Sequence, residues 1–167
     1  MGDIRRALDA AIEYLTAHPE EARYTDSAAT ARLEEGLRFR VTGPGGEELV
    51  TDMPASVGGG AGGPSPGWLF RAALASCEAT LIAMRADQAG VALEGLEVTV
   101  TSESDDRGIL GMDPDVPAGP LSMTVAVSLT PPADVRLDIE GLVGPAAARC
   151  PVHDAIARAV PLSVHMA

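Results

Sequence analysis

Residues 64–86 read PSPGWLFRAALASCEATLIAMRA, a long apolar run with one cysteine, Cys77, near its middle. Ser65 is suited to the N-cap of a helix and Pro66 to its first turn, and Gly90 is suited to its end. The stretch therefore predicts a single helix of about 24 residues and about 36 Å. A helix of this length and composition has to be covered on most of its sides, so it decides the fold.

Arg71, Glu78 and Arg85 of this helix recur at every seventh position. This spacing predicts one narrow polar stripe along the helix. Cys77 shares its face with apolar side chains, so one interpretation of it is a small buried hydrophobic residue. Apolar burial alone raises the pKa of a thiol and makes it unreactive.

The composition limits the possible function. Of 167 residues, 46% are hydrophobic and 3% aromatic, and the formal net charge is −12. A chain of this length is expected to form one domain. The negative charge argues against nucleic acid and against an anionic membrane surface as partners. The N-terminus lacks the pattern of a secretory signal, and two cysteines make no disulfide framework, so we expect a cytoplasmic protein.

The remaining elements are read from periodicity and turn residues. Apolar positions predict a helix over residues 3–17, and alternation predicts strands over 37–42, 47–52, 96–100 and 121–129. We expect helices over 134–150, interrupted at Gly144-Pro145, and over 150–160, and an edge strand over 161–167. This order predicts an α+β fold with an antiparallel sheet.

Two features near the first hairpin are chemically suggestive. Arg38 and Arg40 lie on one face of the strand, opposite its apolar side chains. The usual explanation of such arginines is a solvated sheet face. The glycine-rich stretch 56–67 is not followed by Gly-Lys-Ser/Thr, so we interpret it as a connecting or active-site loop rather than a phosphate cradle.

The second cysteine, Cys150, precedes Pro151 at the predicted start of a helix. The positive end of a helix favours a thiolate, so local physics makes Cys150 the more reactive cysteine. His153 lies three residues further and is placed to assist it. A zinc site is disfavoured because no second pair of ligands is present. No metal or other cofactor is expected.

The two cysteine segments together resemble the OsmC/Ohr family of thiol-dependent hydroperoxide reductases. PSPGWLFRAALASC is followed much later by CPVHDAI, and the hairpin GLRFRVTGPGGEELVTDMP precedes both, in the family's order. The likeness covers about residues 27–166. It divides the chain into an additional N-terminal helix, 1–20, and an OsmC-like domain, 21–167.

The resemblance implies an intertwined homodimer, with antiparallel sheet wrapped around long central helices. It implies an enzyme, an organic hydroperoxide reductase, in which Cys77 attacks the peroxide and becomes a sulfenic acid. Cys150 is then the resolving thiol that forms a disulfide with Cys77, and a dithiol reductant resets the pair. Arg38 is the arginine that supplies positive charge to Cys77, with Arg40 as second choice.

The sequence departs from the family at one position. In the hydroperoxide-resistance branch a glutamate holds the arginine, and here its position is Gly67. Glu78 and Asp52 are the candidates to replace it. Gly67 favours an alternative function, an OsmC-fold protein without efficient peroxidase activity that binds a small molecule or lipid. A third interpretation is a structural dimer whose cysteines only pack.

Overall fold

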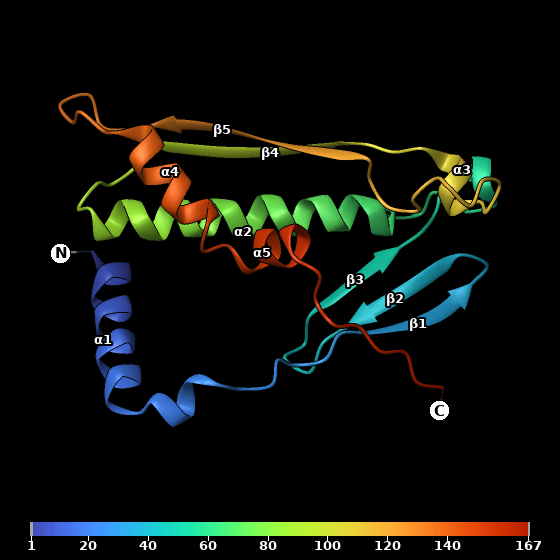
Figure 1. Ribbon diagram of the computed structural model, residues 1–167, viewed down its shortest axis with the longest axis horizontal. Coiled ribbons are helices and arrows are strands. Elements are labelled where there is room, and N and C mark those ends of the chain that lie inside the picture. Colours follow the sequence, from blue (N-terminus) through green and yellow to red (C-terminus); the bar gives the residue numbers. More distant parts are fainter. Residues whose placement is uncertain (1, 167) are drawn as a thin grey trace. The chain divides into compact units, whose positions relative to one another are not determined.

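A computed structural model describes residues 2–166 (Figure 1). The chain forms two compact units. One, here called the arginine unit, comprises Asp9–Phe70. The other, here called the cysteine unit, begins at Arg71 and includes the N-terminal residues up to Leu8. Helix α1 (Asp3–Ala17), predicted over residues 3–17, begins in the cysteine unit and continues into the arginine unit.

The arginine unit contains one antiparallel sheet. Its strands β1 (Thr30–Glu35), β2 (Arg38–Thr42) and β3 (Glu48–Thr51) lie in the order β1-β2-β3. Short 3-10 helices precede and follow the sheet, η1 (Pro19–Ala22) and η2 (Ala55–Val57). The β2–β3 hairpin was predicted from alternation and is confirmed. Strand β1 was not predicted.

The register between β1 and β2 shifts at Glu34. Leu33 pairs with Phe39 and Glu35 pairs with Arg38, so Glu34 has no partner across the ladder. The turn between the strands contains Gly36 at φ 55°, a conformation that glycine adopts without strain. A bulge of this kind redirects the side chain of the extra residue.

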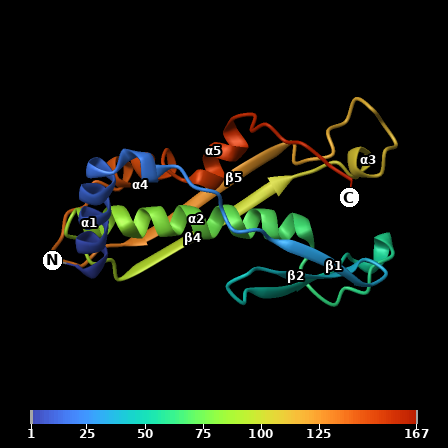
Figure 2. The ribbon, with the colours of Figure 1, turned by 90° about the horizontal axis from the view of Figure 1, so that it is seen from below.

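The cysteine unit is built on helix α2 (Pro66–Gln88), whose first five residues belong to the other unit. Strands β4 (Gly95–Glu103) and β5 (Ser122–Thr130) form an antiparallel pair, with the short helix α3 (Asp106–Ile109) between them. Helices α4 (Ile139–Ala147) and α5 (Pro151–Ala157) follow. Figure 2 shows the β4–β5 pair and α4 beside α2.

The core of the cysteine unit lies where α2, α4 and the β4–β5 pair meet. Ile82 and Ala86 of α2 pack with Leu142 and Ala146 of α4, and all four are buried. Partly buried apolar residues close the core, among them Val98 and Val127 of the strands, together with Leu81, Val91, Leu93, Leu96, Leu129, Leu137 and Val143. The small side chains of Ala86 and Ala146 allow α4 to pack closely against α2.

The predicted ends of α2 are confirmed. The backbone N–H of Trp68 donates to Ser65 Oγ over 3.2 Å, which is the N-cap hydrogen bond expected of this serine. Gly90, with φ 76°, follows the last turn. The predicted polar stripe is wrong at Glu78, which is only 2% exposed. A buried carboxylate needs a partner, and the site supplies one.

Two further expectations were wrong. Helix α4 starts only at Ile139, where Asp138 caps it, and continues through Pro145 without interruption. The predicted edge strand over 161–167 is absent from the part that the structure describes, up to residue 166. Leu162, Val164 and Met166 are 91%, 87% and 99% exposed there. Alternation alone makes no strand, because a strand needs a neighbour to receive its hydrogen bonds.

The antiparallel α+β class is confirmed, and the described residues form two sheets, of three and two strands, in place of a single one. Among residues 2–166, no helix combines the length and the apolar character that crossing a membrane requires.

Candidate functional site

The cysteine unit brings its two thiols together. Cys77 lies near the middle of α2, and Cys150 is the N-cap of α5. Each is a free thiol, Cys77 half-buried and Cys150 fully buried. The Cys77 side chain is one of the neighbours that act on the Cys150 thiol. The backbone positions Cys150 as well, because its N–H donates to Ala147 O at the end of α4 over 3.0 Å.

The protein environment raises the pKa of the Cys150 thiol above its ordinary value. Burial is the main cause, and the neighbouring Cys77 side chain raises the pKa further. The backbone N–H groups of His153 and Val152 act in the opposite direction, as expected at a helix N-cap, but they do not outweigh burial. At Cys150 burial therefore opposes, and outweighs, the effect of the helix N-terminus on which the sequence prediction relied.

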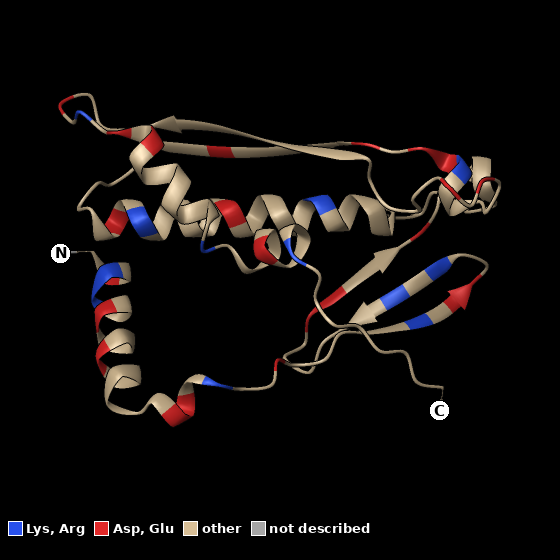
Figure 3. Ribbon diagram, viewed as in Figure 1, with Lys and Arg blue, Asp and Glu red and all other residues tan. Residues whose placement is uncertain are grey.

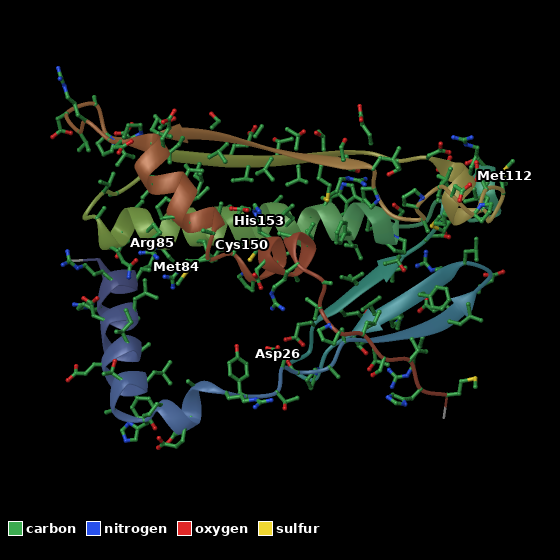
Figure 4. All side chains as sticks on the ribbon, in the orientation of Figure 1. Asp26, Met84, Arg85, Met112, Cys150 and His153 are labelled. Atoms are coloured by element: carbon green, nitrogen blue, oxygen red, sulfur yellow. The ribbon has the colours of Figure 1, made fainter. Side chains whose placement is uncertain are left out.

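A partly buried contact between an imidazole and a carboxylate adjoins the thiols. His153 Nδ1 lies 2.7 Å from Glu78 Oε1. The Glu78 side chain is 2% exposed, whereas that of His153 is 45% exposed. Glu78 follows Cys77 on α2, and the backbone N–H of His153 donates to Cys150 Sγ over 3.4 Å. Figure 4 labels Cys150 and His153, which lie close together beside α2.

A cavity of about 170 Å³ lies between α2, β5 and α5. His153 is its one ionisable lining residue. The other lining residues are apolar: Leu74, Met123, Val125, Ile156 and Ala157. The cavity can take a small apolar group with a single polar contact at the imidazole.

In the arginine unit, Arg38 is held by the carboxylate of Glu34, which was not among the predicted partners. Arg38 Nε donates to Glu34 Oε2 over 3.0 Å, and Arg40 Nε donates to Glu34 Oε1 over 2.6 Å. These two hydrogen bonds lower the pKa of Glu34, that to Arg38 being the larger cause. Arg40 also pairs with Glu48 of β3. Figure 3 shows acidic and basic residues gathered on these strands.

The glycine-rich loop is organised by Asp52. This carboxylate is buried and accepts backbone N–H groups from Gly62 at 2.9 Å, Met53 at 2.7 Å and Gly60 at 3.2 Å. The hydrogen bond from Gly62 is the main cause that lowers the Asp52 pKa, and the Arg38 charge contributes last. Arg38 Nη1 in turn donates to Gly62 O over 3.3 Å. The loop thus supports Arg38 from a second side.

A second cavity, of about 420 Å³, lies in the arginine unit, and Arg38 and Asp52 supply charged groups to its wall. Four glycines of the glycine-rich loop also line this cavity: Gly58, Gly59, Gly60 and Gly62. At Gly59 the approach of the backbone leaves no room for a side chain, because a Cβ there would stand 1.9 Å from Met53 O.

Comparison with protein families identifies the chain. The family model described as OsmC-like protein matches residues 58–165, more than half of the sequence. The chain belongs to the OsmC-like protein family. The match includes both cysteines and the whole of α2. A comparison with curated proteins finds no match.

Solved OsmC-like structures share the fold. An OsmC-like protein from Mycoplasma pneumoniae is 18% identical, with a TM-score of 0.68, covering 82% of this chain and 91% of that one. An organic hydroperoxide resistance protein OsmC from Legionella pneumophila is 24% identical, with a TM-score of 0.55 and coverages of 80% and 90%. A putative organic hydroperoxide resistance protein from Vibrio cholerae, with captopril bound in one of its active sites, is 25% identical, with a TM-score of 0.51 and coverages of 81% and 88%.

The OsmC-like chain thus places its predicted residues in two groups. Cys77 and Cys150 meet in the cysteine unit, and Arg38 belongs to the arginine unit. Of the candidates for holding Arg38, Asp52 binds the glycine-rich loop and Glu78 binds His153, while Glu34 carries the direct hydrogen bonds.

Sequence reasoning missed Glu34 because the residues around it were not assigned to a strand. The signal was present: Glu34 precedes Gly36, and a tight turn there sets the acidic residue against the arginines of the next strand. Among the described residues, no three His, Cys, Asp or Glu side chains gather as they would to hold a metal ion.

Proposed function

We propose that this OsmC-like protein is a thiol peroxidase that reduces organic hydroperoxides. The observation that carries the proposal is the meeting of the two free cysteines, Cys77 and Cys150, in one unit. Two neighbouring thiols, one half-buried and one fully buried, suit a pair in which the more accessible thiol meets the substrate. The name of the 25% identical Vibrio cholerae protein is consistent with this activity.

In the proposed reaction the Cys77 thiolate attacks the terminal oxygen of the hydroperoxide and the O–O bond breaks. Sulfur keeps the hydroxyl group as a sulfenic acid, and the alkoxide leaves and takes up a proton to become an alcohol. Cys150 sulfur then attacks Cys77 sulfur, the S–O bond breaks, and the hydroxide leaves as water with the Cys150 proton. An external dithiol reduces the disulfide.

Arg38 is the proposed source of positive charge for the peroxidatic thiolate. A guanidinium that is held on two sides is preorganised, so it loses little freedom when a thiolate or a peroxide oxygen binds it. Glu34 and the Gly62 carbonyl give Arg38 this support.

The burial pattern of α2 supports a homodimer. Its buried residues are Leu74, Glu78, Ile82 and Ala86, which recur at every fourth position and so lie on one face. The remaining apolar surface of α2 needs cover that a second copy of the chain would supply. A stable monomer at micromolar concentration in light scattering would exclude the homodimer.

Two further expectations from the sequence stay predictions. One is a cytoplasmic setting, and the other is the division of the chain into an N-terminal helix, 1–20, and an OsmC-like domain, 21–167.

One experiment tests the peroxidase. One equivalent of cumene hydroperoxide is expected to convert both thiols to an intramolecular disulfide, and Cys150→Ser is expected to keep a sulfenic acid on Cys77 that dimedone traps. Two free thiols after exposure to peroxide would reject the peroxidase.

A second candidate function is the binding of a small apolar molecule. The cavity of about 170 Å³, with five apolar lining residues and one imidazole, is the observation that favours it. Binding of a small aromatic alcohol, with thiols that stay reduced in hydroperoxide, would favour this candidate over the peroxidase.

A further inference from the structure

The pair Glu78–His153 has no part in the proposed chemistry described so far, yet it joins the two elements that carry the thiols. Glu78 is the residue after Cys77 on α2, and His153 is three residues after Cys150 on α5. Their hydrogen bond of 2.7 Å therefore spans α2 and α5 next to the place where the thiols meet.

Beyond its buried N-cap residue, Cys150, helix α5 has little else that fixes it there. None of its residues is fully buried. The face that includes His153, Ile156 and Ala157 borders the cavity of about 170 Å³, so packing against α2 and β5 is incomplete on that side. A helix of seven residues is too short to be stable alone, so its position depends on its contacts.

The chemistry of the contact makes it directional. A carboxylate with 2% of its side chain exposed needs a hydrogen-bond donor, and His153 Nδ1 is the donor at hand. Such charge-assisted hydrogen bonds fix both distance and orientation. The same residue, His153, also donates its backbone N–H to Cys150 Sγ, so holding His153 holds the sulfur as well.

We propose that Glu78 and His153 are positioning residues that keep the Cys150 thiol opposed to Cys77 and thereby stabilise the Cys77–Cys150 disulfide against reduction. The inference rests on the proposed pairing of these two thiols. When the contact is lost, α5 of the reduced protein gains freedom, the effective concentration of one thiol at the other falls, and disulfide formation becomes less favourable.

The test is a redox equilibrium of the full chain with reduced and oxidised dithiothreitol, which needs no peroxide. Oxidised dithiothreitol takes two electrons from the protein dithiol and becomes the reduced reagent, so the balance of the two forms gives the disulfide equilibrium constant. Glu78→Ala is expected to lower this constant about tenfold, which corresponds to a reduction potential about 30 mV less negative. Glu78→Gln keeps an acceptor for Nδ1–H and is expected to stay within about threefold of the original protein.

A second pair of variants covers the case in which Glu78→Ala does not fold. His153→Ala removes a side chain that is 45% exposed rather than a buried one, and it is expected to lower the constant to a similar degree. His153→Asn retains an N–H near the position of Nδ1, so its disulfide equilibrium constant should return close to that of the original protein. The matched control is Arg71→Ala, which removes another polar contact of α2, to Ser102 Oγ of β4 over 3.3 Å, and touches neither Glu78 nor His153.

Equal constants in the original protein, Glu78→Ala and His153→Ala would overturn the inference, as would the same loss in Arg71→Ala. Failure of the original chain to form a disulfide with dithiothreitol would overturn both the inference and the proposed pairing. A disulfide that forms with dithiothreitol and weakens in the variants, but never forms with hydroperoxide, would support the inference while rejecting the peroxidase.

Discussion

Glu34 binds Arg38 within the sheet of the arginine unit, with Arg38 Nε 3.0 Å from Glu34 Oε2. The carboxylate stands at the bulge of β1, where the register to β2 skips it, and its second oxygen binds Arg40. The arginine that we propose to serve Cys77 is thus anchored without a glutamate at position 67.

Removal of Glu34 should slow the oxidation of Cys77. In Glu34→Ala, Arg38 loses its charged partner and becomes more mobile, so we expect the second-order rate constant with cumene hydroperoxide to fall about threefold to tenfold. Gly67→Glu restores the family glutamate and should leave the rate unchanged, because Glu34 already holds the arginine. A faster Gly67→Glu protein would contradict this assignment.

Arg38 itself should matter more than its anchor. Arg38→Ala removes the positive charge proposed to stabilise the thiolate and is expected to reduce the rate constant by at least about tenfold, one pKa unit being about 1.4 kcal/mol. Arg40→Ala is the matched control, since it also binds Glu34 but makes no hydrogen bond to the glycine-rich loop. Equal rates in Arg38→Ala and the original protein would remove Arg38 from the site.

Two glycines of the loop should behave differently when a methyl group is added. A Cβ at Gly62 would stand 2.5 Å from Arg38 Nη1, the end of a flexible side chain, so Gly62→Ala should displace the guanidinium and slow Cys77 oxidation with little change in Tm. A Cβ at Gly59 would meet the Met53 backbone, so Gly59→Ala should destabilise the protein by about 1–3 kcal/mol. Peroxide kinetics and thermal unfolding distinguish the two, and a large loss of Tm in Gly62→Ala would show that the loop is less adaptable than its contacts indicate.

Asp52 should contribute stability that acid removes. The hydrogen bond from the Gly62 N–H, with those from Met53 and Gly60, holds the pKa of the folded carboxyl below its ordinary value of about 4. Its contribution is therefore complete above that value and is lost as pH falls through the lowered pKa. Urea unfolding should show Asp52→Asn less stable than the original protein at pH 7, with a smaller difference at pH 3. The control is Asp26→Asn, at an exposed position, and a difference at pH 3 as large as at pH 7 would contradict the prediction.

The local elements were predictable because their determinants are close in sequence. Ser65, Pro66 and Gly90 set the ends of α2 through hydrogen bonds and backbone angles within one turn. Alternation set the β2–β3 hairpin and the strands of the β4–β5 pair, since side chains of a strand point to opposite faces in turn. The α+β class followed from the order of these elements. The resemblance to the OsmC/Ohr family followed from the two cysteine segments and the hairpin before them.

Only the tertiary structure decided the environment of each functional group. Burial raises the pKa of Cys150 although its place at a helix N-cap favours the thiolate, and burial of Glu78 next to His153 replaces the polar stripe that its spacing predicted. Glu34 reaches Arg38 through a strand pairing with a bulge, and the alternation of side chains does not predict that bulge. Solvent exposure and charge partners are set by segments far apart in the chain, and the free energy of an ionised group depends on both. The sequence therefore named the candidate residues, whereas their burial and their partners came from the fold.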